Sequence, residues 1–160
     1  MKNIVLLFFL LISQFSIAQN QKIAQLLNQQ LQKEMTHFYN EKERENFTVT
    51  EAFRIDENNI LHFGYTIKSY DGGKISIYSQ IPLNKIMNIG RDYNIYFESL
   101  DNDVTETQTH YDKNGIILRT KTDKTHLFST EINKESYPHR FMKQMAKAIA
   151  KAGYDIECSY

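Results

Sequence analysis

The chain has little cysteine or proline and no tryptophan: its 160 residues include one cysteine, Cys158, and two prolines. A single cysteine cannot form an internal disulfide, so packing and hydrogen bonds must hold the fold together. An excess of charge of one sign is also absent, because 19 basic residues balance 19 acidic ones. A neutral chain offers no electrostatic basis for binding nucleic acid or an anionic membrane, so we expect neither as a partner.

Long hydrophobic runs are absent as well. The one apolar run, from Ile4 to Ile12, is shorter than the roughly 20 residues of a membrane-spanning helix. It follows Lys2 and precedes the small residues Ser16 and Ala18, and these are the three parts of a cleavable secretory signal. We therefore predict a signal at residues 1–18 with cleavage after Ala18, no transmembrane segment after its removal, and a periplasmic or secreted location.

Helical periodicity follows the signal and returns near the C-terminus. Apolar residues recur every three or four positions over about 20–39, which predicts an amphipathic helix. A second such pattern predicts a helix over about 137–152, with Ser136 as its cap and Gly153 as its terminator. The predicted organisation is thus a helix with a charged connector at 19–45 and a β-rich domain at 46–160 that ends in a helix. The stripe of the first helix is Ile23, Leu27, Leu31, Met35 and Phe38.

From Phe47 onward the period changes to two, which is typical of half-buried antiparallel strands. Because a one-residue slip would turn a strand inside out, we pair the apolar faces, and this places Ile55 opposite Leu61 and Ile67 opposite Ile77. The third strand ends at Pro82. Further strands are expected at about 92–99, 103–112, 115–122 and 125–132, with a connector containing one helical turn at 82–90 and a turn at 122–125.

These elements predict an α+β fold that is mostly β, with about seven antiparallel strands in a small barrel or sandwich and a C-terminal helix packed on it. The element order, with a Pro82-Leu83-x-x-Ile86 connector after the third strand, resembles the pleckstrin-homology-like superfold. That resemblance implies two orthogonal sheets over about 47–152 and a helix that closes one mouth, and it implies no function. The alternative is a cystatin-like α+β roll, in which the first helix packs across a curved sheet.

Catalytic motifs are scarce, and the one candidate catalytic residue is Glu51. It interrupts the apolar face of the first strand between Val49 and Phe53. If it points inward, burial raises its pKa, as a general acid requires. The alternative is a bulge that turns Glu51 to water.

No cofactor or metal is expected. Zinc requires three or four converging ligands, and the strand histidines His62, His110 and His126 do not have the spacing that would bring them together. The sequence Asp101-Asn102-Asp103 lacks the glycine that an EF-hand calcium loop carries at its sixth position.

Two groups of side chains predict binding surfaces. Tyr70 and Tyr78 have the outward parity of their strands, near His62, and tyrosine is enriched in recognition surfaces. On the last helix a basic stripe faces away from the apolar side, although such a stripe is also typical of an ordinary solvated face. Its members are Lys143, Lys147 and Lys151.

The leading hypothesis is therefore an exported, non-enzymatic binding or interaction domain, with another protein or a small ligand as its partner. An inhibitor or immunity-type protein is one form of it. One alternative is a small hydrolase with a polar site inside the sheet. The other is a carrier of a small apolar ligand, although bulky inward residues usually fill a small barrel.

Overall fold

The computed structural model describes residues 2–37, 39, 41–133 and 138–158 and leaves the side chains of residues 2–18, 41, 42 and 44 undescribed. Phe38 and Ser136 lie outside the described residues. In chain order the elements are α1 (Lys2–His37), α2 (Glu41–Asn46), β1 (Phe47–Ile55), β2 (Ile60–Lys68), β3 (Lys74–Pro82), the 3-10 helix η1 (Leu83–Lys85), β4 (Ile86–Arg91), β5 (Ile95–Ser99), β6 (Val104–Tyr111), β7 (Ile117–Thr125), β8 (Leu127–Ser129), α3 (Pro138–Lys151) and β9 (Glu157–Cys158).

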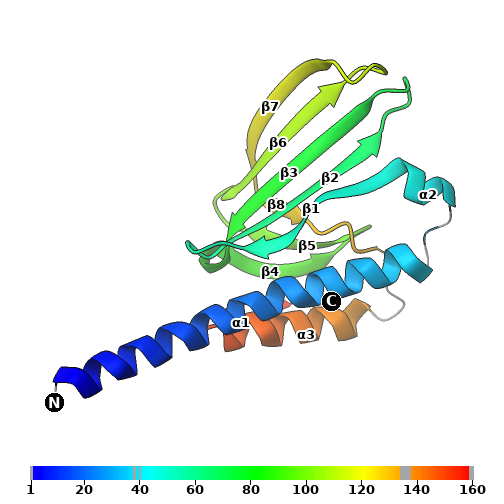
Figure 1. The fold of residues 1–160 in the computed structure, drawn as a ribbon. Helices are drawn as coiled ribbons and strands as arrows, with labels where there is room; N and C mark the ends of the chain where they lie inside the picture. Colours follow the sequence, from blue (N-terminus) through cyan, green and yellow to red (C-terminus); the bar gives the residue numbers. More distant parts are fainter. Residues whose placement is uncertain (1, 38, 40, 134–137, 159–160) are drawn as a thin grey trace.

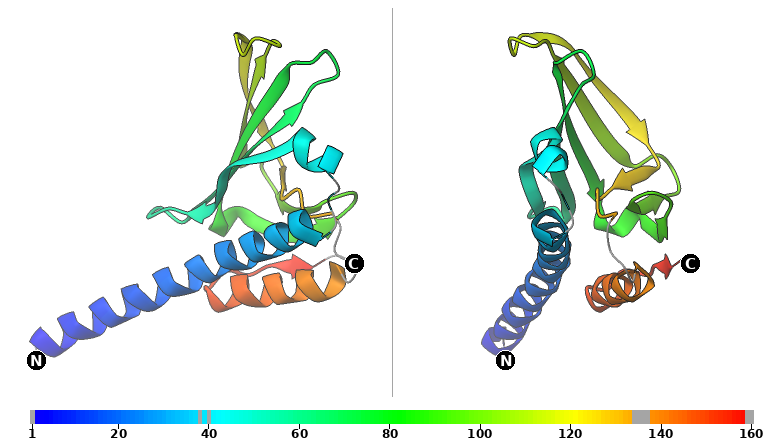
Figure 2. Two further views of the ribbon diagram at one scale, coloured as in Figure 1. Left: turned by 45° about the vertical axis from the view of Figure 1, so that its right-hand side comes forward. Right: turned by 90° about the vertical axis from the view of Figure 1, so that its right-hand side faces the viewer.

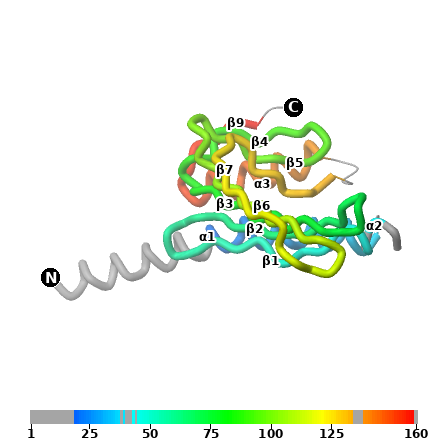
Figure 3. The backbone as a smooth tube through the Cα atoms, turned by 90° about the horizontal axis from the view of Figure 1, so that it is seen from above, coloured from blue at the N-terminus to red at the C-terminus, as the bar shows by residue number. Residues whose placement is uncertain are grey.

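The described strands form two sheets, and the sheets do not close into a barrel. The larger is antiparallel with the order β1-β2-β3-β6-β7, and the smaller has the order β8-β5-β4-β9. Helices α1 and α3 lie side by side along one end of the two sheets (Figures 1 and 2). Seen from above, α1 follows the side of the larger sheet and α3 the side of the smaller one (Figure 3). The prediction of a mostly β fold with an N-terminal and a C-terminal helix is confirmed, and of barrel and sandwich the sandwich fits.

The core lies where the two sheets and the two helices meet. Alternation places Leu61, Phe63 and Tyr65 of β2 inward, and all three are buried. Phe63 stacks on Phe53 of the neighbouring strand with ring centroids 4.0 Å apart. The smaller sheet contributes buried aromatic and aliphatic residues to the same cluster, and α3 adds its predicted apolar face. That face consists of Phe141, Met142, Met145, Ala148 and Ile149.

Helix α1 covers part of the outer edge of β1. The Asn28 side chain pairs with the backbone of Phe53 in both directions: its Nδ2 donates to the carbonyl at 2.8 Å, and its Oδ1 accepts from the N–H at 2.9 Å. The Gln21 amide donates to the carbonyl of Ile55 at 3.2 Å. Backbone groups at a sheet edge otherwise form a template for another strand. Amide side chains from α1 thus replace the missing neighbour at the C-terminal end of β1.

The C-terminal helix ends where the sequence predicts. Gly153 has φ +94°, its N–H donates to the carbonyl of Ala150, and the N–H of Tyr154 reaches back to Ile149. This is the Schellman arrangement, which requires a left-handed residue just past the helix. The prediction of Gly153 as the terminator is confirmed.

The register between β2 and β3 differs from the predicted one by two residues. Ile55 lies opposite Leu61 as expected, but Ile67 lies opposite Ile75 and not Ile77. The reason is the turn: the loop closes between Ser69 and Gly73, which places the left-handed Gly72 at its third position. A shift of two residues keeps every side chain on its predicted face.

Three further expectations about the strands were wrong. Residues 86–91 form β4 and not part of a connector, because buried Ile86 and Ile89 pair with β5 on one side, and Ile89 also pairs with β9 on the other. The predicted turn at 122–125 is absent: β7 stays paired with β6 as far as Thr125, since the segment contains neither glycine nor proline. With β4 and β9 added to the seven strands expected, the described residues contain nine strands.

Candidate functional site

Glu51 does not point into the interior. The pairing of β1 with β2 is irregular on both sides of it, and its carboxylate accepts from Arg54 Nε at 2.6 Å on the solvent side of the strand. Gly64 lies opposite, where a Cβ would come within 3.1 Å of the Glu51 Cβ. The inward position proposed for a general acid is therefore wrong, and the alternative of a bulge that turns Glu51 to water is confirmed.

His62 and Tyr78 meet on the outer face of the larger sheet, as their parity predicts. The Nδ1 atom of His62 lies 2.6 Å from the Tyr78 hydroxyl, and Nε2 lies 3.1 Å from Asp56 Oδ2. A carboxylate only accepts hydrogen bonds, so in the neutral ring Nε2 donates to Asp56 and Nδ1 accepts from Tyr78. The His62 and Tyr78 rings also stack at 6.0 Å, and His62 is 5% exposed.

This Asp56–His62–Tyr78 chain has the connectivity of an orienting acid, a base and a hydroxyl, but its electrostatics do not favour a nucleophile. Burial and the nearby Glu51 carboxylate raise the pKa of Tyr78, so its hydroxyl stays protonated at neutral pH. Partial burial opposes ionisation of Asp56, yet hydrogen bonds from Ile60 N–H and His62 leave its pKa below the ordinary value. These hydrogen bonds connect β2 to β3 and to the turn between β1 and β2, and they leave Tyr78 partly exposed to solvent.

Tyr70 does not join this group. It lies in the turn between β2 and β3, fully exposed, at the opposite end of β2 from His62. Together with Tyr39, Phe47 and Asn133 it lines a cavity of about 560 Å³. The three residues of the predicted aromatic surface thus lie at two separate places.

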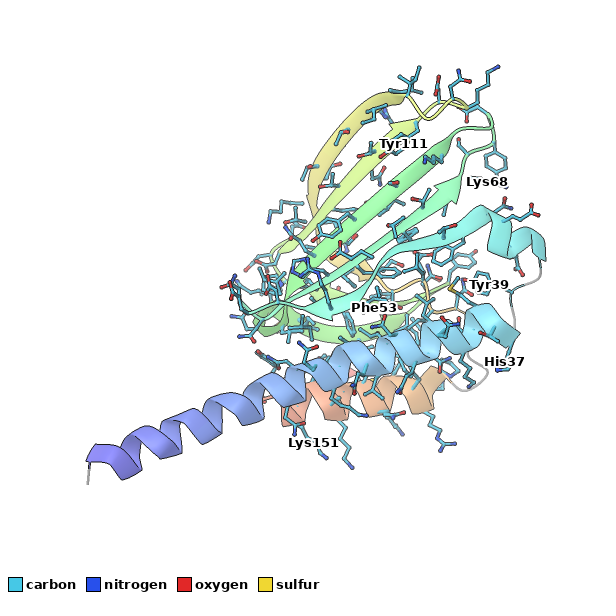
Figure 4. The ribbon with its side chains drawn as sticks, in the orientation of Figure 1. His37, Tyr39, Phe53, Lys68, Tyr111 and Lys151 are labelled. Carbon is cyan, nitrogen blue, oxygen red and sulfur yellow. The ribbon has the colours of Figure 1, made fainter. Side chains whose placement is uncertain are left out.

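The basic stripe of α3 is exposed as predicted. Lys143, Lys147 and Lys151 lie opposite the buried face of the helix. Lys151 points away from both sheets (Figure 4). This arrangement matches the predicted solvated face.

Two carboxylates that the sequence analysis did not single out, Glu34, which is buried, and Glu131, which is partly buried, make contacts between distant elements. Glu34 of α1 has no solvent exposure, and its oxygens accept from the Asn133 N–H at 2.9 Å and from Gln30 Nε2 at 3.1 Å. Glu131, which precedes α3, accepts from the Tyr65 hydroxyl at 3.0 Å. The burial of Glu34 could have been predicted from the sequence, because Glu34 follows Leu31 by three residues and therefore falls on the apolar stripe of the helix. These contacts fasten the segment before α3 to α1 and to β2.

The neighbouring tyrosines respond to these carboxylates. Burial, followed by the charges of Glu34 and Glu131, raises the pKa of Tyr39 to about 12 from the ordinary 10.0. Burial and Glu131 raise the pKa of Tyr65 as well. Both hydroxyls are therefore neutral hydrogen-bonding groups over the whole physiological range.

We expect this raised pKa to make the protein sensitive to alkali. The unfolded chain releases the Tyr39 proton from about pH 10, whereas the folded chain holds it until about pH 12. Stability from this group is complete below pH 10 and falls as the pH rises to 12, by about 1.4 kcal/mol per pH unit. In urea titrations at pH 9–12, Tyr39→Phe should lose less stability across that window than the wild type. Tyr93→Phe, at a position 85% exposed, is the control, and equal slopes for all three proteins would contradict this assignment.

A groove between α1 and β1 has a volume of about 860 Å³. One wall is the C-terminal half of α1, which ends at His37, and the other is the N-terminal half of β1 (Figure 4). Its apolar lining comes from Leu31 and Met35 on the helix and from Phe47, Val49 and Ala52 on the strand.

This groove begins where the amide cover of β1 ends. Asn28 and Gln21 occupy the edge at Phe53 and Ile55, whereas the groove runs beside residues 47–52. Among the described residues that line it, the ionisable side chains are Lys33 and His37, and none is a carboxylate. An edge strand, an apolar floor and basic walls suit an extended polypeptide segment.

No group of three or more His, Cys, Asp or Glu side chains that could hold a metal ion occurs among the described residues. Within the same part of the chain, no helix has both the length and the apolar character that a membrane span requires. No protein-family model matches the chain, and it matches neither a curated protein nor a solved structure. The resemblance to the pleckstrin-homology-like superfold therefore stays a prediction.

Proposed function

We propose that this chain is an exported, non-enzymatic interaction domain that binds an extended segment of a partner protein in the groove between α1 and β1. The observation that carries the proposal is the groove itself, because one of its walls is an edge strand. A segment that enters it can add hydrogen bonds to β1 and place alternate side chains against the helix.

The lining of the groove indicates what kind of segment fits. Met35 and Val49 are only partly buried and present apolar surface to the groove. Lys33 supplies positive charge, and the described residues that line the groove include no acidic side chain. The preferred segment therefore alternates apolar side chains and carries acidic residues.

Such binding is the way an inhibitor or immunity-type protein would act on an exported partner: by occupying one of its extended segments. The enzymatic alternative has less support, because Glu51 is paired with Arg54 on the solvent side and His62 is buried beneath Tyr78. The carrier alternative is also weaker, since the inward aromatic residues contact one another. Phe53 stacks on Phe63, and the ring centroids of Phe97 and Phe128 lie 6.1 Å apart.

Blocking the groove tests the proposal. Ala52 is exposed and lines the groove, so Ala52→Trp should fill it without disturbing the core. We expect random heptapeptides displayed on phage to enrich acidic, β-branched sequences, and the selected peptides to shift the backbone amide resonances of residues 48–52. Ala52→Trp should weaken their binding at least ten-fold, which corresponds to about 1.4 kcal/mol.

The control is Ala150→Trp, which places the same side chain at an exposed position of α3. It should leave the affinity unchanged. Selection of no peptide, or resonance shifts confined to the outer face around Tyr78, would overturn the proposal.

A further inference from the structure

Strand β7 forms the outer edge of the larger sheet on the side opposite to β1. Residues 117–124 are all exposed, so both faces of this strand meet solvent. An edge strand leaves every second N–H and C=O group without a neighbour in the sheet. At the β1 edge, the Asn28 amide pairs with the backbone of Phe53. Among the described residues, no side-chain amide pairs with the backbone of β7 in this way.

The start of β7 exposes an unusual amount of apolar surface. Ile116, Ile117 and Leu118 follow one another and are 62%, 59% and 63% exposed. Leu127, just past the other end of the strand, is 37% exposed. A run of three exposed apolar residues is a liability in a protein that stays alone, and it indicates a partner.

The charges of β7 select one way of pairing the strand with a copy of itself. In an antiparallel pair with Thr122 on the two-fold axis, Lys121 of each copy faces Asp123 of the other. A shift toward Thr120 as the centre would instead place Arg119 opposite Lys121 twice, and like charges directly opposite destabilise a pair. Centring on Lys121 places that lysine opposite itself. Of these three registers, the one centred on Thr122 is the one that brings no like charges opposite each other.

The same register brings the apolar start of β7 close to the second copy. Arg119 of one copy faces Thr125 of the other, which is the last residue of β7, and the next residue, His126, lies in a bend that leads into β8 of the smaller sheet. Ile117 and Leu118 therefore lie at the end of the paired region, beside this bend of the second copy.

We propose that β7 pairs antiparallel with β7 of a second copy of this chain, centred on Thr122, to form a two-fold dimer with one continuous sheet. Lysines on an edge strand ordinarily oppose such pairing. Here Lys121 is held 2.8 Å from Asp123 on its own strand, and in the dimer it exchanges that partner for the Asp123 of the second copy. The proposal is independent of the groove beside β1, which lies at the other edge of the sheet.

A cysteine on the axis tests the register. The test variant combines Thr122→Cys with Cys158→Ser, which removes the one native thiol. It is expressed from the full 160-residue chain and purified from the cells. Opposite residues of an antiparallel pair have Cα atoms about 4.5–5.5 Å apart, which a disulfide can span. We expect mild oxidation to convert most of this variant into a covalent dimer. Thr120→Cys in the same background should not react, because its two copies would lie about 14 Å apart along the strands.

Charge reversal tests the pairing without a cross-link. Lys121→Glu should raise the dimer dissociation constant at least ten-fold in sedimentation equilibrium, because two attractive pairs become repulsive. The double variant Lys121→Glu with Asp123→Lys should restore dimerisation. Lys143→Glu, on the exposed face of α3, should have no effect on it.

A wild-type chain that remains monomeric at millimolar concentration would overturn the proposal. So would equal cross-linking of Thr122→Cys and Thr120→Cys, or a dimer that Lys121→Glu leaves intact.

Discussion

Replacing Phe63 with alanine is expected to lower the free energy of unfolding by about 4 kcal/mol. Phe63 has no solvent exposure, stacks on Phe53 at 4.0 Å and contacts Tyr65 at 5.4 Å between ring centroids. Truncation removes the buried ring and leaves a cavity that the strands on either side cannot close. A domain of this size has a total stability of about 5–15 kcal/mol, so the loss should appear as a large fall in the urea midpoint.

Two companions keep this test informative. Phe63→Leu preserves part of the volume and should cost clearly less, so a fold remains to be measured even if the alanine variant is unfolded. Leu100→Ala, at a position 76% exposed, should change stability by less than about 0.5 kcal/mol. Equal losses for Phe63→Ala and Leu100→Ala would show that β2 does not face the core.

Replacing Glu34 with alanine is expected to cost about 3 kcal/mol. The change leaves two donors, the buried Gln30 amide and the partly buried Asn133 N–H, without their acceptor. It also releases the segment that leads into α3 from α1. Circular dichroism and urea titration would report both the loss of stability and any loss of helix.

The isosteric variant separates hydrogen bonding from charge. In Glu34→Gln the side-chain oxygen can accept from Asn133, and the Gln30 amide can turn so that its oxygen accepts from the new amide group. This variant should cost about 1 kcal/mol or less. If it is as damaging as alanine, the negative charge itself is needed inside the protein.

The sequence predicted the faces of the strands better than their partners. Alternation at Leu61, Phe63 and Tyr65 is a local property, because each residue points the opposite way from the one before it. It placed these residues inward and His62 and Tyr78 outward, as the structure shows. The register at Ile67 could not be fixed in the same way, since loops of equal length closed by Asp71-Gly72-Gly73 or by Tyr70-Asp71-Gly72 both preserve parity.

Strand β4 illustrates what a single sequence hides. Ile86 and Ile89 have a spacing that suits a helical turn, and only pairing with β5 and β9 makes the segment extended. β9 lies at the far end of the sequence, so no pattern near residue 86 predicts that β4 pairs with it. For the same reason the groove was not predicted: its two walls lie on separate elements, and its opening depends on where Asn28 stops covering β1.

The candidate site residues divide along the same line. The outward direction of His62 and Tyr78 was predictable from strand parity, but their contact was not, because it requires the observed register, in which Tyr78 lies opposite Gly64. The part played by Asp56 was not predictable either, because it depends on the turn that brings its carboxylate back to the ring. Glu34 could have been predicted from its position on the apolar stripe, whereas its partner Asn133 lies 99 residues away.

The solvation of both faces of β7 has a consequence for how the molecule opens. The contacts of β7 with β6 include the hydroxyl pairs Thr107–Thr122 and Thr109–Thr120, at 2.9 and 3.3 Å. In the monomer, detaching this strand breaks one ladder and leaves the helices and the aromatic cluster assembled, so its amide hydrogens can exchange with water through a local fluctuation. Those of β2, whose aromatic side chains lie in the core, can exchange only when the whole domain unfolds, so the two strands of one sheet differ in how readily they open.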